Sequence, residues 1–120
     1  MTLLDTSIWI DHLWKNDDIL VRLLEAQQIL MHPFVIGELA LGSLRQRKQV
    51  LKELANLPLA AKASDEEVLV LIERHRLAGS GIGYVDAHLL ASASISVAAL
   101  WTRDKQLHQV ALSLGLARLH

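Results

Sequence analysis

The sequence opens with Met1-Thr2-Leu3-Leu4-Asp5-Thr6-Ser7, a short apolar run followed directly by an aspartate. The same pattern returns near the other end, in Val97-Ala98-Ala99-Leu100-Trp101-Thr102-Arg103-Asp104. A third apolar run, Ile29-Leu30-Met31, has the same brevity. Short apolar runs bounded by polar or turn residues are typical of buried strands. We therefore predict three buried strands, two of which lead to an aspartate.

Helical patterns separate these predicted strands. Pro33 suits the first turn of a helix, Ser64-Asp65-Glu66-Glu67 has the form of a capping box, and Gly115 can end a helix in the left-handed conformation. Apolar spacing predicts helices over residues 18–25, 33–41, 44–55, 65–75, 84–94 and 104–115, with a last edge strand over 116–119. Strands separated by helices imply an α/β fold with a small parallel sheet covered on both faces.

Composition limits the classes of protein that the chain can belong to. The 120 residues are 52% hydrophobic and 21% charged, with a net charge of −1, no cysteine and two prolines. This describes one compact domain over residues 1–120 and excludes disulfide scaffolds and thiolate zinc sites. The apolar runs are too short for a membrane helix, and the N-terminus lacks the features of a signal peptide. We expect a cytoplasmic protein without a membrane partner.

The two aspartates that follow strands lie where parallel sheets bind ligands. The carboxyl ends of parallel strands meet at one edge of the sheet, so Asp5 and Asp104 are expected near each other. The alternative is that each aspartate only caps the helix that follows it, because aspartate is common at that position.

Two further carboxylates interrupt apolar helix faces. Glu38 has Phe34 and Leu41 about one turn away, and Asp86 has Ile82 and Leu90. No lysine or arginine stands one turn from either acid, and an unpaired carboxylate beside a core is costly. We expect metal binding or catalysis to compensate for that cost. The alternatives are an exposed position at the helix border or a salt bridge to a distant arginine.

Together the four acids predict a metal site. Four carboxylates at one rim repel each other, and a hard divalent cation relieves that repulsion. All-oxygen ligation selects Mg²⁺ or Mn²⁺, which are typically held by a few carboxylates together with substrate phosphates. The expected chemistry is therefore phosphoryl transfer.

Four segments of the chain resemble the acidic motifs of PIN-domain ribonucleases, and most nearly those of the VapC toxins of bacterial toxin–antitoxin pairs. The segments occur in the order of the family and span nearly the whole chain: 4–11, 33–39, 85–93 and 100–104. One departure is that many members carry a further acidic residue shortly after the fourth acid, where this chain has Gln106-Leu107.

The resemblance implies a fold, an activity and a set of partners. The fold would be PIN-like, with three layers and a small central parallel sheet flanked by helices. The activity would be Mg²⁺- or Mn²⁺-dependent endoribonuclease cleavage of RNA phosphodiester bonds by a type II toxin. Asp5, Glu38, Asp86 and Asp104 would be the catalytic metal ligands, with the Ser7 hydroxyl beside them. The partners would be RNA, a VapB-type antitoxin that covers the acidic pocket, and a second copy of the chain in a homodimer.

Basic residues outside the four acids predict contacts with RNA phosphates. Four of the 13 acidic residues would be ligands, which leaves nine against 12 lysines and arginines, a net charge of +3. The expected phosphate contacts are Arg103 and Lys105, which flank Asp104, and a helical cluster of Arg45, Arg47, Lys48 and Lys52. The alternative is that this cluster is an ordinary solvated helix face.

Other signals point to different functions with less support. Gly79-Ser80-Gly81-Ile82-Gly83 is not a dinucleotide fingerprint and is more simply a turn. Phosphoryl transfer to Asp5 would need partner residues that the chain lacks. His32 and His88 are expected to be structural, with a hydrogen bond from His88 to substrate as the alternative. The main alternative function is a catalytically inactive PIN-like module that binds RNA or protein, although such a module gains nothing from four repelling acids.

Overall fold

A computed structural model describes residues 1–118, and its centre is a small parallel sheet. The strands are β1 (Thr2–Leu4), β2 (Ile29–Leu30) and β3 (Ala99–Trp101), in the order β2-β1-β3. In register, Leu3 lies opposite Leu30 on one side and Leu100 on the other. The predicted parallel α/β fold is confirmed. The first run forms a fully buried strand, because both of its faces are covered.

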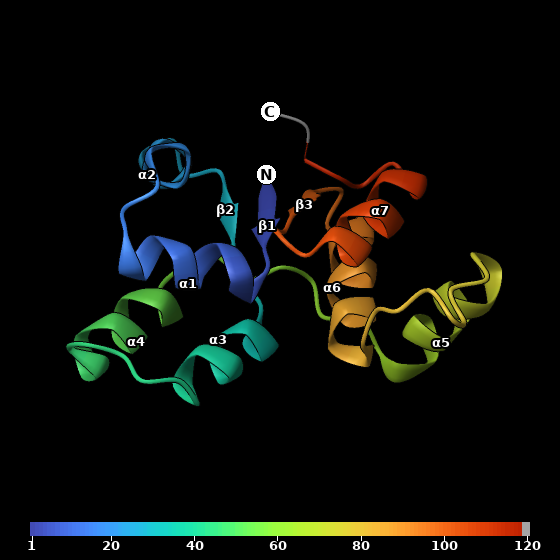
Figure 1. The fold of residues 1–120 in the computed structure, drawn as a ribbon, viewed down its shortest axis with the longest axis horizontal. Helices are drawn as coiled ribbons and strands as arrows, with labels where there is room; N and C mark the ends of the chain where they lie inside the picture. The colour runs from blue at the N-terminus through green and yellow to red at the C-terminus, as the bar shows by residue number, and fades with distance from the viewer. Residues whose placement is uncertain (119–120) are drawn as a thin grey trace.

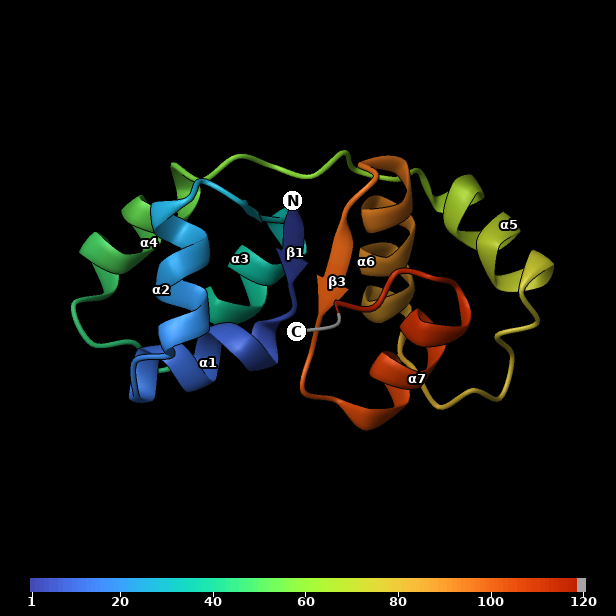
Figure 2. The same ribbon diagram turned by 90° about the horizontal axis from the view of Figure 1, so that it is seen from above.

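Helices cover the sheet on two sides. Figure 2 shows α1 to α4 on the side of β1 away from β3, and α5 to α7 on the β3 side. A long segment that links α4 to α5 runs past one end of the sheet. The helices, labelled in Figure 1, are α1 (Thr6–Trp14), α2 (Asp18–Glu25), α3 (Pro33–Ala40), α4 (Arg47–Ala55), α5 (Asp65–Arg74), α6 (Tyr84–Ile95) and α7 (Lys105–Ser113).

The core lies between the sheet and helices α1 and α6. Leu3, Leu4 and Ile8 are fully buried at the start of the chain, and Leu89 and Leu90 are fully buried on α6. Burial of each such side chain contributes about 1.5–3 kcal/mol. This core holds α1 and α6 against the sheet. None of the helices within residues 1–118 is both long and apolar enough to cross a membrane.

Several helix ends follow the capping signals in the sequence. Ser64 and Glu67 form both hydrogen bonds of the capping box, at 2.9 and 3.1 Å, and Gly115 has a φ of 72°. The predicted helices over residues 18–25, 33–41, 65–75 and 84–94 match α2, α3, α5 and α6 within about one residue. Asp104 caps α7 rather than belonging to it.

Two predicted boundaries are wrong because a residue adopts a positive φ. The helix predicted over 44–55 begins only at Arg47, since Gln46 has a φ of 50° and cannot extend it backwards. The strand predicted from Val97 begins at Ala99, because Val97 has a φ of 52° and belongs to the turn that ends α6. That turn leaves Val97 exposed.

The last predicted strand is reduced to a single contact. Ala117 forms an isolated parallel bridge with Leu100, and residues 116–118 form no strand. Leu119, the end of that predicted strand, lies outside the described residues.

The strand order fixes the place for a site. The chain passes from β1 to β2 on one side and reaches β3 only on the other side of β1. Ligands bind in open α/β sheets at such a switch point, beyond the carboxyl ends of the strands. Here that point lies between the ends of β1 and β3, which Asp5 and Asp104 follow.

Candidate active site

Asp5 lies at the end of β1 and is 8% exposed. Its Oδ1 accepts a hydrogen bond from the Thr6 backbone N–H at 2.7 Å. Its Oδ2 accepts from the hydroxyls of Ser7 at 2.9 Å and Thr102 at 2.7 Å. The aspartate therefore caps α1, as the simpler interpretation held, and presents a fixed carboxylate at the rim of the sheet as well.

Asp104 lies at the corresponding position after β3. Its Oδ1 accepts from the Leu107 backbone N–H at 2.9 Å, so it caps α7. Its own backbone N–H donates to Thr102 Oγ1 at 3.0 Å. Thr102 thus joins the two strand-end aspartates. Thr102 was not among the residues predicted from the sequence, although a hydroxyl two residues before Asp104 mirrors Ser7 two residues after Asp5.

Glu38 lies on α3 and faces solvent, contrary to the expectation that its charge is carried beside the core. The burial of α3 runs through Val35 and Leu39, whereas Leu41, counted as an apolar neighbour of Glu38, is 90% exposed. Glu38 Oε1 accepts from the Thr6 hydroxyl at 3.1 Å, and Thr6 directly follows Asp5. This bond aims Glu38 toward the same rim.

Asp86 lies half-buried in the first turn of α6, where its Oδ2 accepts from the Gly83 backbone N–H at 3.1 Å. Burial raises the pKa of the Asp86 carboxyl, and the negative charges of Asp5, Asp104 and Glu38 raise it further. The Gly83 hydrogen bond opposes these effects without cancelling them. The expectation that charge is carried beside the core holds for Asp86.

The negative charges of Asp5, Asp104 and Glu38 all act on the half-buried Asp86 carboxyl, whose pKa they raise. Three carboxylate oxygens accept no hydrogen bond within residues 1–118, namely Oε2 of Glu38, Oδ1 of Asp86 and Oδ2 of Asp104. Such an all-oxygen donor set fits Mg²⁺ or Mn²⁺. The same residues contain no group of three or more His, Asp or Glu side chains already arranged to hold a metal ion. The fold brings the four acids to one rim but does not close a ligand cage.

Ser7 lies where the sequence analysis predicted a hydroxyl beside the acids. Its Oγ donates to Asp5 and accepts from the Arg103 backbone N–H at 3.1 Å. Ser7 therefore joins the start of α1 to the β3–α7 loop.

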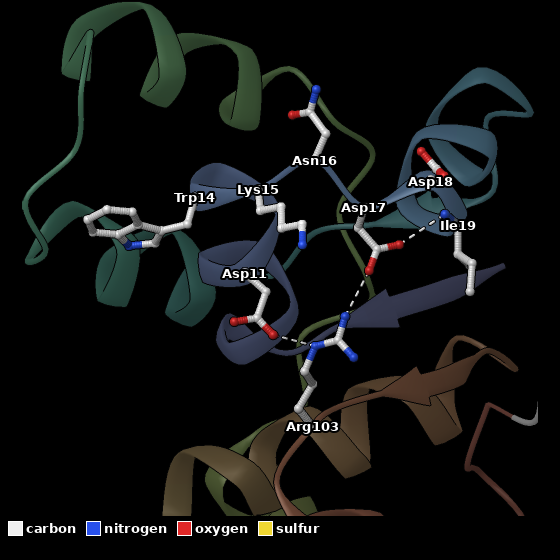
Figure 3. Close-up of a pocket in the computed structure, with 8 residues that line it drawn as sticks. All are labelled: Asp11, Trp14, Lys15, Asn16, Asp17, Asp18, Ile19 and Arg103. Carbon is white, nitrogen blue, oxygen red and sulfur yellow. Dashed lines mark hydrogen bonds and ion pairs between the residues drawn. The ribbon is translucent and has the colours of Figure 1, made fainter.

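Arg103 is held by two acids on the other side of the sheet. Its Nε pairs with Asp11, and its Nη2 lies 2.8 Å from Asp17 Oδ2 (Figure 3). These residues line a pocket of about 590 Å³ beside α1 and α2. None of the four acids lines this pocket, and Arg103 is its one lining residue from the β3–α7 loop.

The other predicted phosphate contacts are exposed. Arg47, Lys48 and Lys52 lie on α4, but Arg45 lies in the turn before it, so the predicted single helical cluster is wrong in that respect. Lys105 begins α7, next to Asp104. Within residues 1–118, no ion pair engages any of these five side chains.

His32 and His88 lie buried at α3 and α6. His32 Nδ1 accepts from the Phe34 backbone N–H at 3.0 Å, and its Nε2 lies 3.1 Å from the Ser92 hydroxyl. His88 Nε2 lies 3.2 Å from Asp65 Oδ1, which also accepts from the Tyr84 hydroxyl. With 2% of its surface exposed, His88 joins α5 to α6 rather than facing the rim. The structural interpretation of both histidines is supported.

The fold and the acidic rim together define a class of α/β protein with carboxylates gathered at a topological switch point. Comparison with known proteins names that class: residues 2–112 match the model of the PIN domain, and the chain belongs to this family. Over 118 residues it is 50% identical to proteins named Ribonuclease VapC32 from two strains of Mycobacterium tuberculosis, covering 98% of this chain and 95% of those proteins. The predicted resemblance to PIN-domain proteins of the VapC group is confirmed.

Solved structures support the same fold. FitAcB from Neisseria gonorrhoeae superimposes with a TM-score of 0.66 at 19% identity, over 100% of this chain and 97% of that one. FitAB bound to an IR36 DNA fragment superimposes with a TM-score of 0.62 at 18% identity, over 100% and 98%. At this level of identity the likeness concerns the fold alone.

Proposed function

We propose that this protein is a Mg²⁺- or Mn²⁺-dependent endoribonuclease, the toxin of a type II toxin–antitoxin pair, acting as a single domain over residues 1–120. The observation that carries the proposal is the placement of the acids: Asp5 and Asp104 follow the neighbouring parallel strands β1 and β3, and Thr6, next to Asp5, hydrogen-bonds Glu38. The same three acids raise the pKa of Asp86. Repelling carboxylates at a strand-end rim have a chemical use when a divalent cation binds there. The 50% identity to a protein named as a ribonuclease supports the same activity.

The four acids, Asp5, Glu38, Asp86 and Asp104, would hold the metal. When bound, Mg²⁺ or Mn²⁺ polarises the phosphodiester and lowers the pKa of an attacking water. The protein groups keep the acids in place. The hydroxyls of Ser7 and Thr102 fix Asp5, the Thr6 hydroxyl aims Glu38, and backbone N–H groups anchor Asp86 and Asp104.

Exposed cations on α4 and α7 would position RNA. Lys105 directly follows Asp104, and Arg45, Arg47 and Lys48 are exposed around the start of α4. None of these four takes part in an ion pair within residues 1–118, so their charges are open to phosphates. Phosphate contacts place the strand without reading its sequence.

Exposed apolar side chains support protein partners, for which we propose a VapB-type antitoxin and a second copy of the chain. Trp14, at the end of α1, is 87% exposed, and Ile10 and Leu13 on the same helix are 45% and 39% exposed. Exposed tryptophans are more typical of interfaces than of free surface. A toxin acting on RNA with its antitoxin would work in the cytoplasm.

The direct test is cleavage of a single-stranded RNA by the purified chain. We expect cleavage in Mg²⁺ or Mn²⁺ and none in chelator. Asp5→Asn, Glu38→Gln, Asp86→Asn and Asp104→Asn should each reduce the rate by at least about tenfold. Asparagine can still cap α1 and α7, so loss of activity in the Asp5 and Asp104 variants would not reflect lost helices.

Two outcomes would contradict the proposal. Full activity in any two of these variants would refute a shared metal site. RNA binding by the wild type without cleavage in either metal would favour the binding module.

The toxin role has its own test. Expression of the chain should arrest bacterial growth, and expression of the Asp86→Asn variant should not. Sedimentation of the purified chain tests the homodimer.

A further inference from the structure

Arg103 connects the two sides of the molecule across the candidate site. Its backbone belongs to the β3–α7 loop between Thr102 and Asp104, while its guanidinium reaches Asp11 on α1 and Asp17 at the start of α2 (Figure 3). Within residues 1–118, these are the ion pairs that join the α1–α4 side to the α5–α7 side; the one other pair, His88–Asp65, stays on one side.

The anchor for Arg103 is itself fixed. Asp17 Oδ1 accepts from the backbone N–H groups of Ile19 and Leu20 at 2.9 and 3.1 Å, so Asp17 caps α2. The Asp17 backbone N–H donates to His12 Nδ1 at 3.1 Å. Asp17 is also mostly buried, with 17% of its side chain exposed. A guanidinium bonded to such a group has little freedom to move.

The ion pairs of Arg103 oppose the repulsion between the carboxylates at the rim. Asp5 and Glu38 lie on the α1–α3 side, whereas Asp86 and Asp104 lie on α6 and before α7. Mutual repulsion of these carboxylates tends to separate the two sides. The attraction of Arg103 for Asp11 and Asp17 draws the loop that carries Asp104 back toward α1.

Resting on the proposed metal-dependent function, we propose that Arg103 is a positioning residue rather than a phosphate contact: it holds the loop that carries Asp104 toward α1 and Asp5, on the rim where a divalent cation would bind. The local charges favour this role over RNA binding. Arg103 and Lys15 face Asp11, Asp17 and Asp18 in the same pocket, so the group is net negative and repels a phosphate.

Mn²⁺ binding to the purified chain, measured by electron paramagnetic resonance of the free ion, tests the proposal. Electrostatics and positioning predict opposite changes in the Mn²⁺ affinity of an Arg103 variant. Arg103→Gln removes a positive charge beside an acidic rim, so electrostatics alone would tighten Mn²⁺ binding. Loss of positioning would instead weaken it, by about tenfold or more. Binding as tight as that of the wild type, or tighter, would overturn the proposal.

Asp17→Asn is the matched second variant. Asparagine can still cap α2, but its side-chain nitrogen cannot accept the Arg103 hydrogen bond. We expect weaker Mn²⁺ binding, and in the double variant no weakening beyond that of Arg103→Gln, because Arg103→Gln already removes the pair with Asp17. Additive losses would contradict this. Arg103→Lys keeps the charge without the two-pronged geometry and should lie between the wild type and Arg103→Gln.

Arg22→Gln is the control for net charge. Arg22 is exposed on α2 and takes part in no ion pair within the described residues, so this variant should bind Mn²⁺ within about twofold of the wild type.

The salt dependence of RNA binding in chelator distinguishes a phosphate contact of Arg103 from a positioning role. A lost phosphate contact lowers the slope by about 0.7, whereas lost positioning leaves it equal to that of Arg22→Gln. Excess Mn²⁺ should restore the cleavage rate of Arg103→Gln only if Arg103 positions the acids.

The result for the wild type separates this inference from the proposed function. If the wild type binds no Mn²⁺ at millimolar concentration, the metal-dependent function fails and the positioning role fails with it. If the wild type binds Mn²⁺ and Arg103→Gln binds it equally well, only the positioning role fails.

Discussion

The Thr102 hydroxyl donates a 2.7 Å hydrogen bond to Asp5 Oδ2, which joins the end of β3 to the end of β1 across 97 positions of sequence. The Thr102 hydroxyl oxygen also accepts a hydrogen bond from the Asp104 backbone N–H at 3.0 Å. One buried hydroxyl therefore sets the positions of both strand-end aspartates.

Replacement of Thr102 by valine keeps the shape of the side chain and removes the hydroxyl. We expect a loss of about 1–3 kcal/mol in the free energy of unfolding, because Asp5 and the Asp104 N–H lose a partner. We also expect a rate of RNA cleavage at least about tenfold lower. Urea unfolding and a cleavage assay measure the two effects. Thr102→Ser, which keeps the hydroxyl, should lose markedly less of both, and equal losses would show that packing matters more than the hydrogen bond.

Neutralising Asp86 should stabilise the protein in chelator. Burial and the neighbouring acids raise its pKa above the ordinary value of 3.8, so the folded chain binds a proton more tightly than the unfolded chain does. The free energy of unfolding of the wild type in chelator should therefore rise, relative to Asp86→Asn, as pH falls through the raised pKa toward 3.8.

Thermal melting at pH 7 in chelator checks this effect, with a higher Tm expected for Asp86→Asn than for the wild type. Mn²⁺ should raise the Tm of the wild type by mass action and that of the variant much less. Asp18→Asn is the control, because an acid in the first turn of α2 favours the helix dipole and its loss should lower the Tm slightly. A lower Tm for Asp86→Asn in chelator would argue against a repulsive cluster.

His32 should make the fold sensitive to acid. Burial, with smaller contributions from the charges of His88 and Lys62, lowers its pKa from 6.5 to about 4. The unfolded chain then binds the proton more readily, so stability is full above pH 6.5 and falls as pH drops toward 4. The loss at pH 5 is about 2 kcal/mol.

Urea unfolding at pH 7.5 and pH 5 of the wild type and of His32→Asn measures this loss. Asparagine can still cap α3 but does not titrate, so the variant should be less stable at pH 7.5 and should lose less on acidification. An equal loss in both proteins would assign the acid sensitivity to other groups.

The cations around the start of α4 should contribute to RNA binding but not to chemistry. Reversal of Arg45, Arg47 and Lys48 to glutamate removes up to three phosphate contacts, so the salt dependence of binding to single-stranded RNA should fall by about two units of slope. Turnover of a short substrate should persist. Reversal of Arg22, Arg74 and Arg76, three exposed arginines on α2, on α5 and just after α5, controls for net charge. An unchanged slope would show that these residues form ordinary solvated surface.

Local patterns predicted much of this fold. The capping box at Ser64, the left-handed turn at Gly115 and the aspartates that end two strands all depend on residues within about four positions of each other. Helix boundaries failed where Gln46 and Val97 adopt a positive φ, because non-glycine residues rarely do so and no local signal marks them.

By itself, the sequence determined which acids lie at strand ends and helix starts, because apolar periodicity and capping are encoded by near neighbours. The tertiary structure alone decided that Glu38 is exposed, that Thr6 and Thr102 fix the acids, and that Arg103 is paired with Asp11 and Asp17. The residues that these contacts join lie far apart in the sequence. The separation is 32 positions for Thr6 and Glu38, 97 for Asp5 and Thr102, and 86 for Asp17 and Arg103. Such separations are set by how the two helix layers pack on the sheet, and no spacing within a helix or a strand can specify them.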